Sequence, residues 1–533
     1  MNRLLIILLI SFLGSSCESW LDVKPENQVT YTNFFEDEKD VEGAAFEMFA
    51  TEAAYIGCEG DYLKWQGILA DEWSDTYNAP RLGRFSDLAG GWGDGGWKHS
   101  YDIVFLANTI LENAHRASMS KDRLNFWIGQ ASFTKGLAYF ELVRLYGDAV
   151  ITKNSTSLEK YGRKPMLEVI DTAIVNAERA YRLLPVFEEL KDLSGAAITS
   201  KQYASKGAAA ALLAHLYAWR GSVIELYGLT GDATGDYQKS IDYCTLIIDK
   251  KAGFYELHSS PEALCQAMSK MGGENKESIF ELELNPKEDY AQAVRVLGVF
   301  LTGYPVNVNA TLAAQKSRSF RLKWTTVEQM YEAKDKRVDA YFYLDDEILN
   351  NLQTYPYAYL RKWREGIYFT SSSGSSETTM GALRANQVQW RVADIYLLRA
   401  ECRAKLGIAD AKDDLNKVRT RANATLYPAV GESDLKLAIF KERERELLYE
   451  NHRYADIVRN GKTYIQKYLG HCLSTDKGLE ENALKYVTDQ EIKDGMTTKS
   501  SINSRENLFA EIYKRKAEFA CANRKRGVTN SLF

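Results

Sequence analysis

The sequence predicts a mainly α-helical protein with little β structure. Only 9 of its 533 residues are proline, well below the average usage of about 5%, so few residues interrupt helices. Several segments also repeat small and apolar residues with helical spacing. Hydrophobic residues make up 45% of the chain and charged residues 26%, a composition typical of folded proteins and unlike that of disordered or collagen-like chains.

Residues 1–16 have the features of a signal peptide. Arg3 precedes an apolar run over residues 4–13, and small residues follow. The run is too short to span a bilayer, which takes about 20 apolar residues. The sequence Leu-Gly-Ser-Ser before Cys17 resembles a bacterial lipobox, which predicts lipidation of Cys17 and a firm membrane anchor. The alternative is an ordinary signal peptide followed by a cysteine by chance.

Two segments near the C-terminal end predict a tight helical hairpin. In each, small or apolar residues recur at offsets of 0, 4, 7 and 11, which places them on one face of a helix. The first set is Ala393, Leu397, Ala400 and Ala404, and the second is Ala411, Leu415, Val418 and Ala422.

The same offsets predict another hairpin earlier in the chain. Its faces are Ala208, Leu212, His215 and Trp219, followed by Tyr237, Ile241, Cys244 and Ile248. Looser helical patterns cover residues 131–146 and 167–184. Alanine-rich faces let helices approach closely, as in tetratricopeptide hairpins, but a strict 34-residue period is missing. We therefore expect degenerate tetratricopeptide-like hairpins.

Long segments between the helical patterns predict loops. Residues 57–100 are rich in Gly, Asp, Trp and Tyr, residues 253–325 mix β-like pieces with turn residues, and residues 366–381 contain a serine run. Because long loops on a rigid scaffold often carry ligand contacts, we expect the binding residues there.

Several kinds of chemistry lack their motifs. The sequence has no H-E-x-x-H, G-x-S-x-G, Walker A or dinucleotide motif, and its His and Cys residues lack metal-ligand spacing. We therefore expect no metal and no cofactor. His215, Cys244 and Cys402 are predicted to be buried core residues, while disulfides among the six cysteines after Cys17 remain open. The net charge of −5, −6 without Arg3, gives no reason to expect a nucleic-acid partner.

Two groups of carboxylates deserve comparison with glycosidases, which need a pair of them. Glu442, Glu446 and Glu450 are four residues apart and alternate with arginines, a pattern that favours a salt-bridged structural helix. Asp71, Glu72 and Asp75 lie beside Trp73 and Tyr77. That second group has residues suited either to hydrogen-bonding sugar hydroxyls or to catalysing hydrolysis.

Trp92 and Trp97 stand in a glycine-rich stretch, Gly-Gly-Trp-Gly-Asp-Gly-Gly-Trp-Lys. Glycine leaves an indole face uncovered, so a tryptophan here is suited to stacking on a sugar ring. Asp94, Lys98 and Arg81 would then supply hydrogen bonds. The alternative is that one of the two indoles plugs the loop into the core.

Five segments, taken in order, resemble the SusD/RagB family. They are residues 17–22 (CESWLD), 97–111 (WKHSYDIVFLANTIL), 130–151 (QASFTKGLAYFELVRLYGDAVI), 390–404 with 414–422, and 439–461 (IFKERERELLYENHRYADIVRNG). Gln130, Asp394 and Asn451 depart from the usual Glu, Glu and Gly of the family. The last residues, 530–533, also lack the family's usual ending.

The resemblance implies an outer-membrane lipoprotein on the surface of a Bacteroidota-type cell. Such a protein covers a SusC-type TonB-dependent transporter and delivers glycans to it, or peptides in RagB-like members, without catalysis or a cofactor. It also implies a SusD-like fold in which four tetratricopeptide-like units face the transporter and loops hold the ligand. We expect residues 17–250 and 251–533 to pack into one globule.

We predict a ligand site from the positions of residues along the chain, because ligand residues vary between members of the family that this chain resembles. Its residues are Asp75, Tyr77, Arg81, Trp92, Trp97 and Trp324. The charged residues of the segment 439–461 are expected to be scaffold. Two other hypotheses remain: a surface glycoside hydrolase that uses Asp71, Glu72 or Asp75, and a helical scaffold that binds only a partner protein.

Overall fold

Helices make up most of the computed structural model, as the sequence predicts. The structure describes residues 34–53, 94–156, 161–269, 275–283, 304–312, 322–354, 357–370, 378–383 and 385–469. In its N-terminal half the helices are α2 (Glu38–Glu52), α5 (Asp94–Asn113), η4 (Ala114–Arg116), α6 (Lys121–Tyr146), α7 (Met166–Leu183), η5 (Phe187–Glu189), α8 (Lys206–Tyr227) and α9 (Ala233–Ile248). They are followed by α10 (Pro261–Met268), α12 (Trp324–Met330), α13 (Arg337–Tyr341), α14 (Asp346–Leu349), α15 (Val392–Lys405), α16 (Ala411–Ala422), α17 (Leu435–Glu446), α18 (Arg453–Arg459) and α19 (Lys462–Leu469).

The strands of the described residues form two-stranded antiparallel sheets. The pairs are β1 (Ala149–Val150) with β2 (Arg163–Lys164), β3 (Ser278–Leu282) with β8 (Gln387–Arg391), β4 (Leu322–Lys323) with β5 (Tyr357–Ala358), and β6 (Gly366–Thr370) with β7 (Thr378–Leu383). The β3–β8 pair joins segments more than a hundred residues apart, and β8 runs directly into α15.

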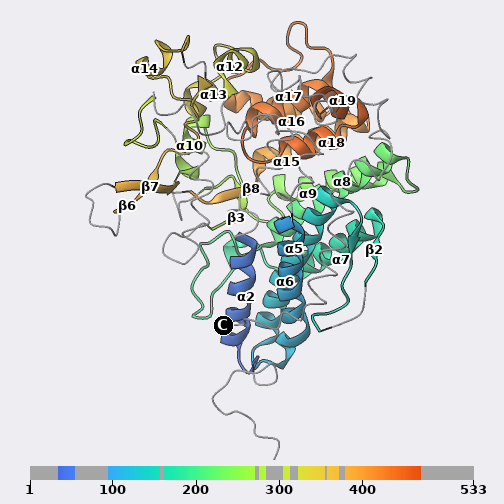
Figure 1. Cartoon of the computed structure of the whole chain (residues 1–533). Coiled ribbons are helices and arrows are strands. Elements are labelled where there is room, and N and C mark those ends of the chain that lie inside the picture. The colour runs from blue at the N-terminus through green and yellow to red at the C-terminus, as the bar shows by residue number, and fades with distance from the viewer. Residues whose placement is uncertain are drawn as a thin grey trace, which may run out of the picture.

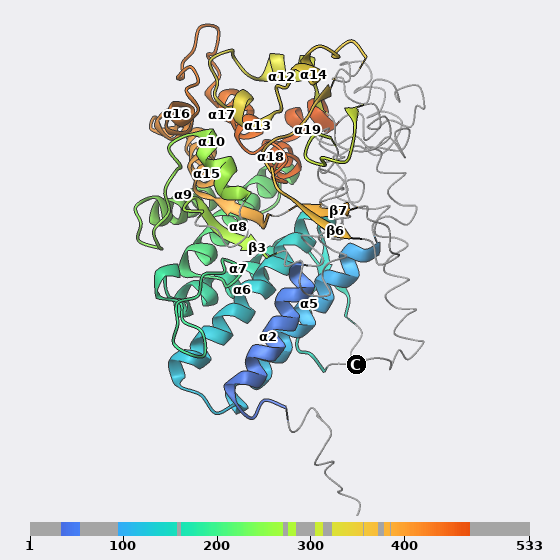
Figure 2. The ribbon, with the colours of Figure 1, turned by 90° about the vertical axis from the view of Figure 1, so that its left-hand side faces the viewer.

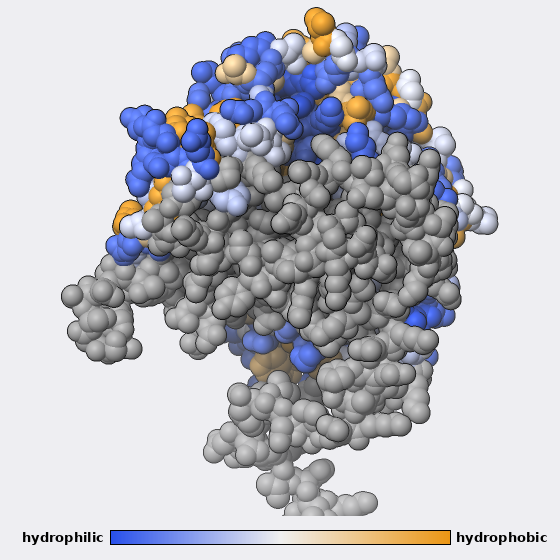
Figure 3. All heavy atoms as spheres, turned by 45° about the horizontal axis from the view of Figure 1, so that its top comes forward, coloured by the Kyte–Doolittle hydropathy of each residue, from blue (hydrophilic) through white to orange (hydrophobic). Residues whose placement is uncertain are grey.

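The helices are arranged in two regions joined by α8 and α9. Helices α2, α5, α6 and α7 form the lower region in Figures 1 and 2, and α12–α14 with α16–α19 form the upper one. Helix α8 packs against α7 and α9, and α9 packs against α15. In the view tilted by 45° to bring the upper end forward, the coloured surface of that end is mainly hydrophilic, with hydrophobic residues in small separate areas (Figure 3).

Both predicted hairpins are confirmed. The eight residues predicted to form the faces of α15 and α16 are all buried, and the two helices pack against each other. In the α8–α9 hairpin, Ile248 is only partly buried, whereas the other seven predicted face residues are buried. His215, Cys244 and Cys402 are buried as predicted, and both cysteines are free thiols.

Local capping sets the ends of the central helices. The Ser120 hydroxyl accepts a hydrogen bond from the Arg123 amide at the start of α6, and Ser205 does the same for the Ala208 amide at the start of α8. Helix α8 ends at Gly228, whose φ of 62° is in the left-handed region that favours glycine. These caps satisfy backbone groups that the helix itself leaves unpaired.

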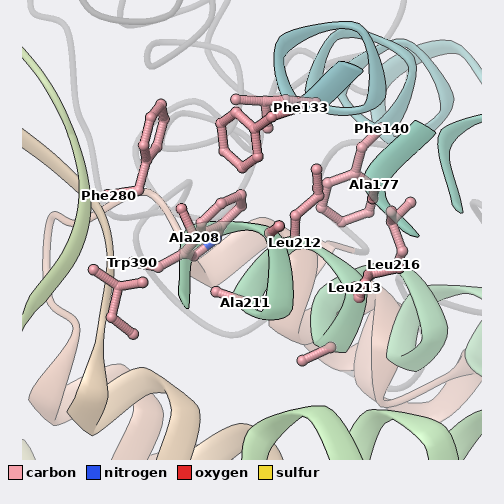
Figure 4. Packing of buried hydrophobic residues seen from close by; sticks show 14 of the residues in the cluster. Phe133, Phe140, Ala177, Ala208, Ala211, Leu212, Leu213, Leu216, Phe280 and Trp390 are labelled. Carbon is pink, nitrogen blue, oxygen red and sulfur yellow. The ribbon is translucent and has the colours of Figure 1, made fainter. Parts of the chain in front are cut away.

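The core lies where α6, α8 and the β3–β8 sheet meet. The ring of Phe133 is 4.8 Å from that of Phe280 and 6.4 Å from that of Trp390, centroid to centroid. Figure 4 shows these rings beside the small residues of α8, of which Ala208 is completely buried. Small side chains on α8 let its neighbours approach closely, which explains the alanine-rich face seen in the sequence.

All three loop predictions were wrong in part. Residues 366–381 were predicted to be a loop, but 366–370 and 378–383 pair as the β6–β7 hairpin. Residues 94–100 were predicted to belong to a loop and instead begin α5. The predicted loop 253–325 contains the helix α10. Hydrogen bonding between strands in the first case, and packing on α6 in the second, outweigh the local preference of serine and glycine for irregular structure.

Candidate functional site

The structure describes two of the six predicted ligand residues. Trp97 and Trp324 are described, whereas Asp75, Tyr77, Arg81 and Trp92 lie outside the described residues, as do Asp71, Glu72 and Cys17. Trp97 lies in the first turn of α5 and Trp324 begins α12. Figures 1 and 2 place α5 in the lower region and α12 in the upper one, so the two indoles are in different parts of the molecule.

Trp97 is a partly buried residue held by two tyrosines. Its ring centroid is 5.1 Å from that of Tyr101, one turn along α5, and 5.2 Å from that of Tyr146 at the end of α6, with the latter pair edge to face. The Tyr101 hydroxyl is fixed in turn, because it donates to the Val150 carbonyl at 2.9 Å and accepts from the Val150 amide at 2.7 Å. The indole is therefore preorganised while part of it stays accessible to solvent.

Polar groups surround the start of α5. Lys98 Nζ lies 2.6 Å from Asp102 Oδ2, with 71% and 41% of the two side chains exposed, and His99 Nδ1 lies 3.8 Å from the same oxygen. Exposed donors and acceptors beside a partly open aromatic ring match the surface of a sugar, which has an apolar ring face and a rim of hydroxyls. Lys98, a predicted hydrogen-bond donor, follows Trp97 on α5 and is paired with Asp102.

Trp324 has a different environment. The indole Nε1 donates to Glu328 Oε1 one turn later, at 3.0 Å, and the ring packs in part against the main core. Its polar edge is thus engaged within its own helix. This contact favours a packing role over a ligand contact.

Tyr101 and Tyr146 support Trp97 but were not among the predicted site residues. Trp97 and Tyr101 are four residues apart, so a helical prediction for this segment would have placed their side chains next to each other. Tyr146 contacts Trp97 only through the packing of α5 on α6, and one-dimensional spacing does not reveal that contact.

The carboxylates of the segment 439–461 are buried and paired with basic side chains. Glu442 and Glu446 lie on α17, whereas Glu450 was predicted to share their helix and instead lies in the turn after it. Glu450 Oε2 lies 2.7 Å from Arg391 Nε, and Glu446 Oε1 lies 2.7 Å from Arg391 Nη1.

These carboxylates are unsuited to general acid catalysis. Burial alone would raise the pKa of Glu450, but the charges of Arg391 and Lys362 lower it to about 2. The pKa values of Glu442 and Glu446 are lowered too, because the charges of neighbouring arginines outweigh burial. A glycosidase acid needs a raised pKa, so the salt-bridged structural interpretation is supported here.

The buried histidines are occupied by structural contacts. His215 Nε2 lies 2.7 Å from Asp394 Oδ2, and Asp394 Oδ1 accepts a hydrogen bond from Arg443 Nη2 at 2.7 Å.

Across the described ranges, no group of three or more His, Cys, Asp or Glu side chains is placed to hold a metal ion. In the same ranges, no helix has both the length and the apolarity needed to cross a membrane.

Sequence comparison finds two matching families. The pattern of the SusD family matches residues 306–525, and that of a family described as "Starch-binding associating with outer membrane" matches residues 86–218. Over these two segments the chain is similar to the SusD/RagB family. It is 23% identical to SusD-like protein P2 of Formosa agariphila over 496 residues, which cover 85% of this chain and 89% of that protein.

Solved SusD structures share the fold. A SusD homologue from Bacteroides thetaiotaomicron superposes with a TM-score of 0.65 at 20% identity, covering 88% of this chain and 97% of that one. A structure named SusD-like carbohydrate binding protein, from Bacteroides vulgatus, superposes with a TM-score of 0.59 at 19% identity, covering 80% and 84%.

Two of the three departures from the usual SusD/RagB residues have structural explanations. Gln130 Nε2 donates to the Ala204 carbonyl and its Oε1 accepts from the Ala204 amide, both at 2.8 Å. An ionised glutamate has no hydrogen to donate to the carbonyl, so the amide suits this contact. Asn451 replaces a glycine at a left-handed position, φ 67°, a conformation that asparagine tolerates better than most residues.

Proposed function

We propose that this protein is a non-catalytic surface lipoprotein that captures glycans and delivers them to a SusC-type TonB-dependent transporter. The observation that carries the proposal is Trp97, a partly exposed indole fixed by Tyr101 and Tyr146 beside the exposed Lys98–Asp102 pair. Stacking on an indole gives moderate affinity, which suits a protein that must release its ligand again.

Similarity to the SusD/RagB family supports the glycan as ligand. One matching family is described as starch-binding and associating with the outer membrane, and one superposable structure is named a carbohydrate binding protein. Asp75, Tyr77, Arg81 and Trp92 are proposed to complete the site around Trp97. Trp324, whose indole bonds Glu328, is proposed as a peripheral contact only.

The anchor and the transporter are proposed from the sequence and from the family resemblance. Lipidation of Cys17 after removal of residues 1–16 would tether the folded body to the outer membrane, facing the cell surface. The two regions 17–250 and 251–533 are proposed to act as one unit, with the helical hairpins turned toward the transporter.

Substitution of Trp97 tests the binding site. The protein without its lipid anchor is titrated, by calorimetry, with a glycan that it binds. Trp97→Ala is measured in the same way. The control is Phe254→Ala, which removes an aromatic side chain from a residue that is 51% exposed. Loss of a stacking contact is expected to weaken binding about tenfold, and the control is expected to bind normally. Melting curves show whether each variant is folded. An unchanged affinity in a folded Trp97→Ala protein would reject this site.

A further inference from the structure

Glu52 is a buried acid with no compensating contact in the described structure. It is the last residue of α2 and only 1% exposed. Among the described residues, neither of its carboxyl oxygens has a hydrogen-bond partner. An ionised carboxylate in such a place carries a large desolvation cost, which a neutral carboxylic acid largely avoids.

A second buried acid lies close by on α6. Glu141 is also 1% exposed and forms an ion pair with Arg144, one turn further along the helix. Burial, and then the negative charge of Glu141, raise the pKa of Glu52 to about 8. Glu52 is therefore neutral at pH 7 in the folded protein.

Glu141 lies near the end of α6 that supports Trp97, and Glu52 at the end of α2 lies close to Glu141. Tyr146, whose ring packs edge to face on Trp97, is five residues after Glu141 on the same helix. Helices α2, α5 and α6 pack against one another (Figure 2), so a change in the contact of α2 with α6 acts on the helix pair that positions the indole.

Other titratable groups at this end have contacts of their own. On α5, Lys98 and His99 both lie near Asp102, and Tyr101 bonds the backbone of Val150. On α6, Arg144 also stacks over the ring of Phe140, with 4.4 Å between its guanidinium carbon and the ring centroid.

We propose that Glu52 is a proton-dependent positioning residue for the Trp97 site: as a neutral acid it lets α2 pack against α6, and its ionisation beside Glu141 loosens that contact. The inference rests on the proposed glycan-binding function for its effect on affinity. Its effect on stability depends only on the described helices.

The direction of the pH effect follows from proton linkage. Because the pKa of Glu52 is higher in the folded than in the unfolded state, the folded protein holds the extra proton between about pH 4.5 and pH 8. Its contribution to stability is complete below that range and is lost as the pH rises through it. Glu52→Gln is neutral at every pH and has nearly the same shape, so it is expected to fold.

The experiment compares melting temperatures and glycan affinities of the unmodified protein and Glu52→Gln from about pH 5 to about pH 9. The matched control is Glu168→Gln on α7, whose side chain is 53% exposed. We expect the melting temperature of the unmodified protein and of the control to fall relative to Glu52→Gln as the pH rises. Their glycan affinity should fall several-fold over the same interval, while that of Glu52→Gln changes less.

Two results overturn the proposal while leaving the proposed function standing. Parallel melting profiles for the unmodified protein and Glu52→Gln would show that Glu52 is not held neutral. Diverging melting profiles with identical affinity profiles would show that Glu52 affects stability but does not position the site. Absence of glycan binding by every protein at every pH would instead reject the proposed function, and the positioning role with it, while the melting profiles still report the state of Glu52.

Discussion

Arg391 and Glu446 form a fully buried ion pair, with 2.7 Å between Nη1 and Oε1, that joins the end of strand β8 to the end of helix α17. Among the residues that the structure describes, the pair belongs to a connected network in which six basic side chains meet six carboxylates. Its members are Arg337, Lys362, Arg391, Arg419, Arg421 and Arg445 with Glu277, Asp335, Glu432, Glu442, Glu446 and Glu450. The network is thus balanced in charge, which is the condition for burying so many ions.

Removing Arg391 is expected to be strongly destabilising. Arg391→Met leaves three buried carboxylates, Glu277, Glu446 and Glu450, without one of their basic partners. Breaking a buried pair from one side costs about 3–5 kcal/mol, measurable as the free energy of unfolding in urea. The control Lys164→Ala breaks an exposed pair with Glu168 and should cost no more than about 1 kcal/mol. Equal losses in the two variants would contradict a structural role for the network.

His452 predicts a loss of stability in acid. Burial, together with the nearby charge of Arg443, lowers the pKa of His452 to about 4, although Asp394 acts in the opposite direction. Between about pH 4 and pH 6.5 the unfolded chain therefore binds the extra proton, and stability falls as the pH falls through that interval.

Replacing His452 should remove part of this acid sensitivity. His452→Gln cannot take up the proton, so its unfolding free energy should depend less on pH, by up to about 3 kcal/mol over the interval. His115→Gln, at an exposed position, serves as the comparison and should follow the unmodified protein. If His452→Gln and the unmodified protein keep the same slope, His452 does not titrate abnormally.

Asn451 should tolerate glycine better than alanine. Its φ of 67° is costly for a residue with a side chain, and its Oδ1 is buried without a hydrogen-bond partner in the described structure. Asn451→Gly is expected to be at least as stable as the unmodified protein, and Asn451→Ala to lose about 1 kcal/mol. Chemical denaturation measures the free energy of unfolding of both variants. An alanine variant as stable as the glycine variant would contradict the expectation.

Two helical glycines should respond to alanine in opposite directions. A Cβ at Gly43 on α2 meets nothing within 4 Å, whereas one at Gly136 on α6 lies 3.1 Å from the Ala173 carbonyl oxygen of α7. Gly43→Ala should therefore stabilise the protein by about 0.5–1 kcal/mol, and Gly136→Ala should destabilise it by about 1–3 kcal/mol. Differential scanning calorimetry of both variants measures this contrast, which would vanish if α6 and α7 were loosely packed.

The helical hairpins were predictable because their information is local. Alanine and leucine recur every three or four residues along α15 and α16, and all the residues so selected are buried. The scaffold role of the segment 439–461 was also predictable from its alternating charges. The ion-pair partners of this segment were not predictable from the sequence. Arg337 and Lys362 are far away along the chain, and only the fold brings them to Glu442 and Glu450.

The candidate site shows the limits of local patterns more clearly. Glycines before Trp97 predicted an open loop, but packing on α6 draws the residue into the first turn of α5. Glu52 gave no signal, because an acidic residue at a helix end is normally exposed. Its burial depends on contacts between helices that no spacing along the chain reveals.

The central claim, glycan capture without catalysis, is tested most directly by affinity electrophoresis. The protein lacking residues 1–17 is run through gels that contain different polysaccharides, and parallel incubations are assayed for new reducing ends. We predict retardation by at least one glycan with no new reducing ends. New reducing ends would contradict the non-catalytic role and favour a hydrolase, and free migration in every gel would contradict glycan binding itself.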